Sequence, residues 1–370
     1  MAIDLNFDEQ QQMIRDTARS FFDQQSQIHL VRRYRNSEDE FPRELWGRMA
    51  ELGWLAMGLP ADHGGFESSF LDSFALSIEL GRSLAPVPYL ENWIGSRLVA
   101  EVGSDAQKAA LLPGLASGEL ILTPAIIEPV GAYGACGVRL RASSEGTGFV
   151  LEGEKALVAY AGSAERLIVA ARREDGGLSL FLVDPNSSGV SLERTPNTAE
   201  LPLYHVRFSR TKVGPEDLLG GEGDRSTALH SVQMRAAVLQ AAMIQGAGER
   251  LLDLTADYAR MRVQFGNQIG KHQAVQYLVT DMVIHTHNAG LLALNAAWRI
   301  AGGMDFLREA AFAKAAASRA AHSVTFASHE VHAGIGFMED YDLQLFTRRS
   351  KHWEFNLGDT RWCLEQALAA

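Results

Sequence analysis

The sequence has few of the features that mark secreted, membrane or metal-binding proteins. Only two cysteines, Cys136 and Cys363, occur in 370 residues, and they lie far apart, outside any metal-ligand spacing. This pattern predicts no metal site and two buried, reduced thiols. No apolar run is long enough to span a bilayer, and residues 1–12 lack the basic and apolar regions of a signal peptide. We therefore expect a protein of the reducing cytoplasm that has no membrane partner.

Basic side chains are also in deficit. The 34 Lys and Arg residues against 45 Asp and Glu give a formal net charge of -11. Such a charge argues against a nucleic-acid partner or an anionic-membrane surface, since both are negatively charged. The remaining composition, with 46% hydrophobic and 21% charged residues, is that of an ordinary soluble globular protein. A chain of this length exceeds a usual single core, so we expect two or three packed domains.

The spacing of apolar residues changes twice along the chain. Residues from Asp8 to about Ser117 repeat at helical spacing, with Asn6 or Asp8 available as an N-cap. From about residue 119 to 219, short β-rich runs such as RLIVAAR and LSLFLVD are separated by Gly, Asn and Asp clusters. The helical pattern returns after Gly223 and contains Ala-rich stretches that allow close helix contacts. These textures predict a mainly α protein with a central β domain, divided into residues 1–118, 119–222 and 223–370.

The stretch RVQFGNQIGKHQAVQ, residues 262–276, interrupts the C-terminal helical region. Arg262 offers a planar charged fork suited to phosphate, and Gly266 allows a sharp turn or the close approach of a ligand. Gln273 supplies two donors and an acceptor just past the break. One interpretation is a ligand-binding segment, and the other is a helix–loop–helix corner with a polar surface.

This stretch resembles the flavin-binding signature of the acyl-CoA dehydrogenases, which it matches in order at Arg262, Phe265, Gly266, Ile269 and Gln273. Three more segments resemble landmarks of the same family in the same order: LGWLAMGLPADHGG at 52–65, LEGEKALV at 151–158 and HAGIGF at 332–337. The resemblance spans nearly the whole chain. It implies an N-terminal helical domain, a small β-barrel or sandwich, and a C-terminal four-helix bundle.

The resemblance also implies FAD as the cofactor, bound between the β domain and the bundle across a subunit interface. In the family, the Arg and Phe of the signature come from the neighbouring subunit, and the Gly-rich turn contacts the adenosine diphosphate part. The residues that match these roles are Arg262, Gln264, Phe265, Gln273 and Gly334. A homodimer or a dimer of dimers, an acyl-CoA substrate and electron-transferring flavoprotein as the acceptor are further implications of the resemblance.

The implied reaction is the α,β-desaturation of an acyl thioester. A carboxylate removes the α proton while the flavin accepts a hydride from the β carbon, and hydrogen bonds stabilise the developing enolate. The family places this carboxylate at one of two positions, which read Leu357 and Ala236 in this chain. Neither side chain can move a proton. Asp359 is the carboxylate nearest to the thioester end of the site, although the residues that follow it equally predict an N-cap of the last helix.

Other positions near the implied flavin also depart from the family pattern. An aromatic residue and a Thr are usual where this chain has Leu157 and Ala159, and a Thr-Glu-Pro segment reads Ile127-Glu128-Pro129. The usual Gln before the Gly-rich turn is Glu330, whose charge has the wrong sign for a pyrophosphate unless it is paired. His329 and His332 offer such a pairing, but ordinary solvated or core histidines are the alternative interpretation.

Three hypotheses about function follow. The first is an FAD-dependent acyl-CoA dehydrogenase whose base lies at an unusual position. The second is a subunit of a mixed oligomer in which a homologous chain supplies the base, as in bacterial family members that act on steroid side chains or dicarboxylic acyl-CoA esters. The third is a catalytically silent scaffold that binds acyl-CoA or flavin. The alanines at 236, 237, 241 and 242 either widen an acyl pocket or serve tight helix packing, so the acyl group stays open.

Overall fold

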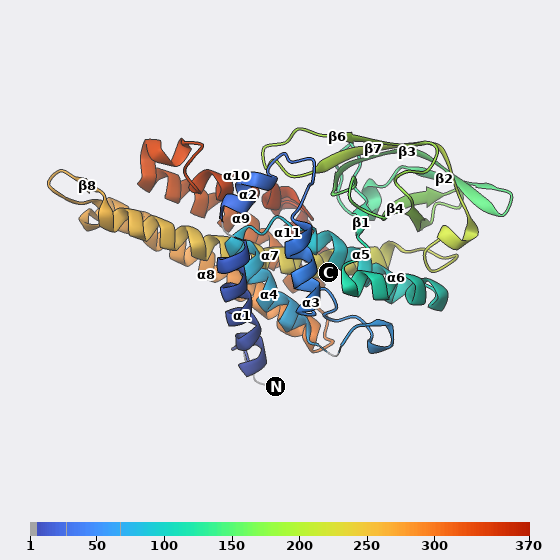
Figure 1. Cartoon of the computed structure of the whole chain (residues 1–370), viewed down its shortest axis with the longest axis horizontal. Coiled ribbons are helices and arrows are strands. Elements are labelled where there is room, and N and C mark those ends of the chain that lie inside the picture. Colours follow the sequence, from blue (N-terminus) through green and yellow to red (C-terminus); the bar gives the residue numbers. More distant parts are fainter. Residues whose placement is uncertain (1–5, 27, 67) are drawn as a thin grey trace. The chain divides into compact units, whose positions relative to one another are not determined.

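The computed structural model describes residues 6–26, 28–66 and 68–370, and Figure 1 shows the course of the chain. The helices that precede the sheet are α1 (Glu9–Gln25), α2 (Ile28–Tyr34), α3 (Arg43–Glu51), α4 (Phe70–Ser83), α5 (Tyr89–Val102) and α6 (Asp105–Ser117). The helices that follow it are α7 (Ser226–Met261), α8 (Gln273–Ala301), α9 (Leu307–His332), α10 (Leu343–Phe355) and α11 (Thr360–Ala369).

The strands of the central region are β1 (Leu122–Ala125), β2 (Arg141–Glu145), β3 (Gly148–Ala159), β4 (Arg166–Arg173), β5 (Leu178–Val183), β6 (Val190–Arg194) and β7 (Leu203–Val213). A separate hairpin consists of β8 (Val263–Gln264) and β9 (Asn267–Gln268). Short 3-10 helices are η1 (Ala61–His63), η2 (Ala135–Gly137), η3 (Pro215–Asp217), η4 (Ile269–Lys271) and η5 (Ala333–Phe337). In the described part of the chain, no helix combines the length and apolarity needed to cross a membrane.

The chain forms two compact units, which we call the helical unit and the sheet unit. The helical unit comprises the described part of residues 1–32 together with 69–85 and 237–370, and the sheet unit comprises 33–68 and 86–236. The predicted changes of secondary structure occur where expected, since α6 ends at Ser117 and α7 begins at Ser226. The division into three domains at these points stays a prediction.

Helix α1 begins where the sequence predicted a cap. The Asp8 carboxylate accepts a hydrogen bond from the Gln11 backbone N–H at 2.8 Å, and the Gln11 side chain accepts one from the Asp8 N–H at 3.0 Å. This reciprocal capping box satisfies two donors that the first turn of a helix leaves free. One face of the helix then buries Ala18 and Phe22, whereas Met13 is exposed on the opposite face.

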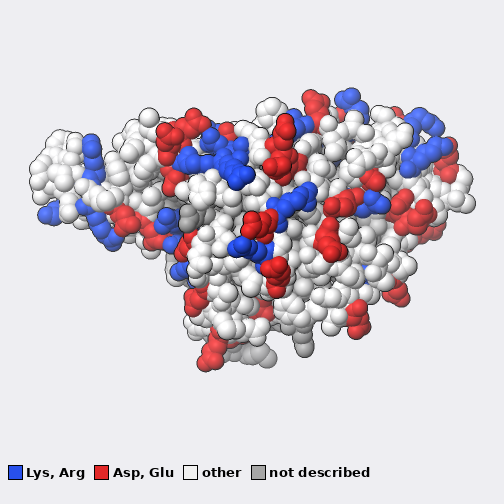
Figure 2. All heavy atoms as spheres, in the orientation of Figure 1, with Lys and Arg blue, Asp and Glu red and all other residues white. Residues whose placement is uncertain are grey.

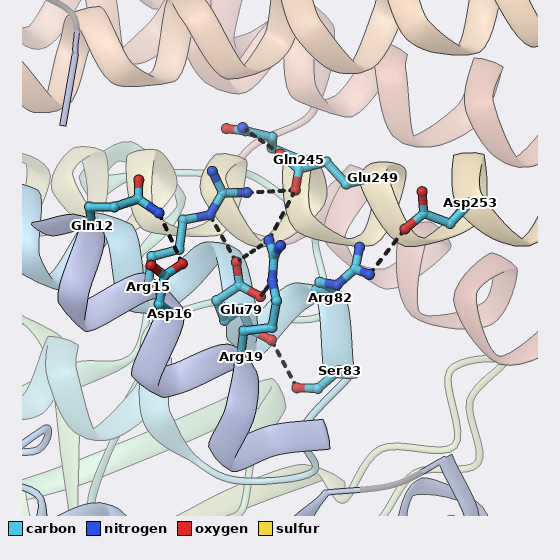
Figure 3. Close-up of polar contacts among 10 residues, drawn as sticks. All are labelled: Gln12, Arg15, Asp16, Arg19, Glu79, Arg82, Ser83, Gln245, Glu249 and Asp253. Carbon is cyan, nitrogen blue, oxygen red and sulfur yellow. Dashed lines mark hydrogen bonds and ion pairs between the residues drawn. The ribbon is translucent and has the colours of Figure 1, made fainter. Parts of the chain in front are cut away.

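An ion-pair network attaches α1 to α4 and α7 in the helical unit (Figure 3). The Glu79 carboxylate on α4 is 1% exposed and accepts from Arg15 and Arg19, each at 2.8 Å. Arg15 also reaches Glu249 on α7 at 2.6 Å. A buried carboxylate is stable only with such partners, because its desolvation otherwise costs several kcal/mol. The network therefore fixes which face of α1 lies against the other two helices.

Helices α4 and α7 also cross at backbone contact. A Cβ atom added to Gly81 would lie 1.9 Å from the Met243 carbonyl oxygen, and one added to Gly246 would lie 1.8 Å from the Ile78 carbonyl oxygen. Only glycine fits at either position, because any side chain would push the two helices apart. Elsewhere in the helical unit, α9 packs against α8, α10 and α11 through a face of buried alanines, as the Ala-rich sequence predicted.

The sheet unit is built on one mixed sheet of seven strands. Its order is β1-β4-β2-β3-β7-β6, and β5 pairs with β4 off this path. The longest pairing joins β3 and β7 in antiparallel register from Phe149 opposite Val213 to Ala159 opposite Leu203, with irregularities between Leu151 and Gly153 and between Lys155 and Val158. Helix α5 lies against β1, where the Asn92 side chain accepts a hydrogen bond from the Leu122 N–H at 3.2 Å.

Candidate functional site

The segment that carries Arg262 folds as a hairpin between the two longest helices. Strands β8 and β9 pair in antiparallel register around a two-residue turn, in which Phe265 has a φ of 52° and Gly266 a φ of 76°. Two left-handed residues are what the tightest hairpin turn requires, but the conformation is costly for a bulky residue. The Phe265 side chain is nevertheless 92% exposed at the tip of the hairpin, beyond the ends of α7 and α8 (Figure 1). A strained and exposed aromatic ring indicates a contact outside this chain.

Arg262 stands at the base of this hairpin. Its backbone N–H donates to the Tyr258 carbonyl at 2.9 Å, and its own carbonyl accepts from the Ile269 N–H at 2.8 Å. The guanidinium, by contrast, makes no hydrogen bond or ion pair with any residue that the structure describes. On the face shown in Figure 2, the hairpin end carries basic but not acidic side chains. The backbone is therefore fixed, and the charged fork is available to an external anion.

The two predicted glutamines beside Arg262 bond within the same segment. Gln264 donates to the Val263 carbonyl at 2.7 Å, and Gln273 donates to the Tyr277 hydroxyl at 2.8 Å. Both side chains are exposed, so their remaining polar atoms face solvent. The structure thus brings Arg262, Gln264 and Phe265 together on one hairpin, with Gln273 at the start of the next helix.

The Gly-rich turn forms η5, directly after α9. A Cβ atom added to Gly334 would meet no atom within 4 Å, and the residue is exposed. Nothing inside the described chain therefore requires glycine at this position, and the close approach of an external group is the remaining physical reason for one. The neighbouring side chains of Ile335 and Phe337 are 41% and 74% exposed, which gives the turn an apolar outer surface.

The two histidines of this region serve the packing of the helical unit. His332 is 1% exposed, stacks on Tyr258 with ring centroids 4.5 Å apart, and contacts the Ser328 carbonyl through Nδ1 at 2.8 Å. His329 is half-buried and hydrogen-bonds Thr347 at 2.8 Å. Burial lowers the pKa of both rings and so favours their neutral form. The prediction of ordinary packed histidines is confirmed, and neither ring offsets the charge of the exposed Glu330.

The turn between α10 and α11 holds the first position at which the resemblance expects a base. Leu357 is half-buried with a φ of 60°, and Gly358 follows with a φ of 113°. The Asp359 carboxylate accepts a hydrogen bond from the Trp362 N–H at 2.7 Å and so caps α11. The capping interpretation of Asp359 is confirmed, and its role as a base stays a prediction. The second expected position, Ala236 on α7, is fully buried.

A buried lysine that sequence reasoning missed holds this turn. Lys314 on α9 is 0% exposed, and its ammonium donates to the carbonyls of Trp353 at 3.0 Å and Gly358 at 2.8 Å. It also donates to the Ser318 hydroxyl at 2.7 Å. Burial lowers the pKa of Lys314 to about 8. The available signal was a lysine on the alanine face of α9, where a charge survives only if something binds it.

In the sheet unit, Lys155 forms a second buried cationic centre. Its ammonium donates to the Glu128 carboxylate at 2.8 Å and to the Ile126 carbonyl at 3.1 Å, and burial lowers its pKa to about 8. The same Glu128 oxygen accepts from the N–H groups of Arg139 and Leu140 at 2.8 and 2.9 Å. The Glu of Ile127-Glu128-Pro129 therefore joins the start of β2 to β3.

The end of β3 has the side chains that depart from the family pattern. Leu157 has a φ of 55° and is 50% exposed. Ala159 presents only its backbone, whose carbonyl accepts from the buried Thr123 hydroxyl at 2.6 Å. A hydroxyl donor at position 159 is thus missing, and Thr123 does not replace it because its proton is directed to that carbonyl.

The prediction of two buried cysteines holds for Cys363 but not for Cys136. Cys363 is buried within the helical unit, and burial raises the pKa of its thiol to about 11. Cys136 is exposed, so the prediction of a buried thiol was wrong there. Its position in η2, in the loop before β2, explains the difference, because loops run over the surface.

Known proteins match the chain along nearly its whole length. The model of the acyl-CoA dehydrogenase N-terminal domain matches residues 8–119, and that of the C-terminal domain matches residues 228–369. Acyl-CoA dehydrogenase FadE27 of Mycobacterium tuberculosis is 31% identical over 330 residues, which cover 87% of this chain and 86% of that protein.

Two solved structures share the fold. The ChsE4-ChsE5 complex from Mycobacterium tuberculosis matches with a TM-score of 0.91 and 27% identity, over 99% of this chain and 98% of the other. A variant of the Tcur3481-Tcur3483 steroid acyl-CoA dehydrogenase matches with a TM-score of 0.87 and 29% identity, over 98% and 97%. The predicted fold, with an N-terminal helical domain, a small β-barrel or sandwich and a C-terminal helical bundle, is confirmed, and the central β domain of the shared fold is a half-barrel.

Proposed function

Because this chain belongs to the acyl-CoA dehydrogenase family, we propose that it takes part in the α,β-desaturation of an acyl-CoA thioester as one subunit of a mixed oligomer. A homologous second chain would supply the catalytic base. The observation that carries this proposal is that leucine and alanine, at Leu357 and Ala236, stand at the two positions where the family has its base. Neither side chain can accept a proton. The nearest carboxylate, Asp359, is engaged as a helix cap.

The reaction needs two groups on opposite sides of a carbon–carbon bond. A carboxylate takes the proton from the α carbon, and FAD, when bound, accepts the hydride that leaves the β carbon. Two electrons and one proton thus leave with the hydride, and the second proton leaves with the base. This chain has groups suited to binding and orientation, but none at either expected position that is suited to the proton transfer.

The residues of the helical unit fit the adenosine diphosphate end of FAD. The unpaired Arg262 guanidinium suits a pyrophosphate, the exposed Phe265 ring suits the adenine, and the open backbone at Gly334 admits a close approach. The residues of the sheet unit fit the flavin ring end poorly, since Leu157 and Ala159 offer neither a flat ring nor a hydroxyl. We therefore propose that the hairpin serves the cofactor of the partner subunit.

The relatives support a mixed assembly. One of the similar solved structures is a complex of two named chains, and the other carries two chain names as a steroid acyl-CoA dehydrogenase. Electron-transferring flavoprotein is the expected acceptor, since another relative is a subunit of a caffeyl-CoA reductase-Etf complex.

The test is to purify the chain alone and together with a family homologue that carries the glutamate at the position of Leu357. Flavin content is read from the visible spectrum, and activity from the reduction of an electron acceptor with a panel of acyl-CoA thioesters. We expect little flavin and no turnover for the chain alone, and both for the pair.

The Asp359→Asn variant separates the two enzyme hypotheses, because Asn caps a helix about as well as Asp but cannot act as a base. Under the proposal, the pair keeps its activity with Asp359→Asn. Full turnover by the chain alone, abolished by this substitution without loss of folding, would instead assign the base to Asp359.

A further inference from the structure

A guanidinium without an anionic partner lies inside the sheet unit, on α5. Arg97 is partly buried, and its guanidinium carbon lies over the Trp93 ring, 5.4 Å from the centroid. Its Nη2 atom lies where a side chain at Gly58 would begin, 2.4 Å from an added Cβ. Gly58 has a φ of 70°, and its N–H is held by the Ser68 hydroxyl at 2.6 Å. The Trp93 ring and the Gly58 backbone, which has no side chain, thus leave space for the Arg97 guanidinium and contact it.

Arg97 makes no hydrogen bond or ion pair with any part of the chain that the structure describes, and its cation–π contact is with Trp93. The nearest carboxylate, Glu101, is one helical turn away and is paired with Arg235 of α7. The three charged side chains together carry one net positive charge. The five N–H donors of this partly desolvated guanidinium therefore have no acceptor among the residues that the structure describes.

A partly desolvated guanidinium without an anionic partner is less stable than a paired one, and a ligand anion would supply the pairing. Burial lowers the pKa of Arg97, Glu101 opposes this effect, and Arg235 lowers the pKa further. An arginine stays charged in proteins, so the cost is not relieved by losing a proton. Other arginines in this protein, such as Arg15 and Arg35, are instead paired with carboxylates. Those arginines are also partly buried, whereas unpaired arginines such as Arg262 and Arg308 are exposed to solvent. A partly buried arginine without a partner, as at Arg97, points to an anion that comes from outside the chain.

We infer that Arg97 binds the carboxylate of a ligand, with Trp93 and Gly58 fixing the plane of its guanidinium. A carboxylate matches the flat fork through two parallel hydrogen bonds. Its single charge also equals the excess positive charge of the Arg97, Glu101 and Arg235 cluster, whereas a phosphate monoester would bring nearly two. The aromatic floor favours a ligand with an apolar portion beside the charged group.

The source of the carboxylate rests on the proposed function. If this chain serves an acyl-CoA dehydrogenase, the ligand is an acyl thioester that carries a second carboxyl group at its far end. Arg97 would then determine specificity for the acyl group, because a fatty acyl chain without a second carboxylate cannot pair with its positive charge. A partly buried donor set without a partner disfavours the ligand that lacks the matching group, which is the stronger form of selection.

The first experiment tests the anion site without any turnover. The melting temperature of the chain is measured at constant ionic strength with glutarate or adipate, and with the neutral glutaramide and adipamide. We expect the dicarboxylates to raise it by about 1–3 °C at concentrations well above Kd, and the diamides not to raise it. Where the chain needs its partner subunit for purification, the same measurement is made on the pair.

The decisive variant is Arg97→Met, with Arg308→Met as the matched control. Arg308 also lies over an aromatic ring on its own helix, at 5.7 Å from the Phe312 centroid, but it is exposed. Arg97→Met should weaken glutarate binding by at least about tenfold without lowering the melting temperature of the free protein. Arg308→Met should leave glutarate binding unchanged. The Glu101→Gln variant should strengthen binding, because it removes the charge that competes for the cluster.

Three outcomes would overturn the inference: no difference between glutarate and glutaramide, a glutarate effect that survives Arg97→Met, or an equal loss in Arg308→Met. A second assay identifies the source by comparing kcat/KM for adipyl-CoA and hexanoyl-CoA in the assembled pair. We expect a preference for adipyl-CoA that Arg97→Met reverses. Glutarate binding without turnover of any thioester would retain the carboxylate site as that of a free acid and reject the proposed function.

Discussion

Two chain reversals in the helical unit use the same backbone device for opposite purposes. The β8–β9 hairpin and the turn before α11 each place a bulky residue with positive φ directly before a glycine, at Phe265 and at Leu357. Phe265 extends into solvent at 92% exposure, whereas the turn at Leu357 is held from inside by Lys314. We call the hairpin the outward reversal, because its exposed ring can contact another molecule. We call the turn before α11 the inward reversal, because it is held by buried hydrogen bonds and has no proton-transfer group at Leu357.

The largest expected difference between the two reversals is in stability. Lys314→Met removes the ammonium donor of the carbonyls of Trp353 and Gly358, which should lower the free energy of unfolding by about 2–4 kcal/mol. Arg262→Met removes an unpaired exposed cation and should change it by less than about 0.5 kcal/mol. Urea denaturation of both variants measures this contrast, and flavin content of the assembled pair should fall only with Arg262→Met at matched folded protein. Equal losses of stability would mean that the hairpin is as firmly held as the turn.

The inward reversal should also respond to pH. The folded-state pKa of Lys314 is about 8 and its ordinary value is 10.5, so between these limits the unfolded chain binds more protons than the folded one. Stability from this group therefore rises with pH across that window, by up to about 3 kcal/mol. The difference in unfolding free energy between wild type and Lys314→Met should grow accordingly from pH 8 to 10.5. The raised pKa of Cys363 acts in the opposite direction in both proteins, and a difference independent of pH would contradict the prediction.

The smallest expected effect is the change in the free energy of unfolding when backbone strain is relieved in each of the two reversals. Asn tolerates the left-handed conformation, and Asn-Gly is a preferred pair in two-residue hairpin turns. Phe265→Asn should therefore raise the free energy of unfolding by about 0.5–1 kcal/mol, because the exposed ring packs against little. Leu357→Asn relieves similar strain but removes a half-buried apolar side chain. We therefore expect its change in the free energy of unfolding to be about 1 kcal/mol less favourable than that of Phe265→Asn. The same chemical denaturation assay checks both, and equal effects would show that Leu357 is not packed.

Much of the local structure could be predicted from residues close together in the sequence. The cap at Asp8, the interruption after Arg262 and the cap at Asp359 each depend on side chains within a few positions, and local hydrogen bonds decide them. The alternation of helical and β texture likewise follows from short-range apolar spacing. The exposure of Cys136 was not predictable in this way, because cysteine is buried on average and only the course of its loop exposes it.

By itself, the sequence determined the order of helices, sheet and helices, the family to which the chain belongs, and the absence of a carboxylate at Leu357 and Ala236. Only the tertiary structure decided which charges are satisfied. Lys314 meets carbonyls some 40 positions away, and Arg97 meets none within the described residues, although both are basic residues among apolar neighbours on a helix. The physical reason is that burial and hydrogen-bond pairing depend on which elements pack together, and that information is not local to any stretch of the chain.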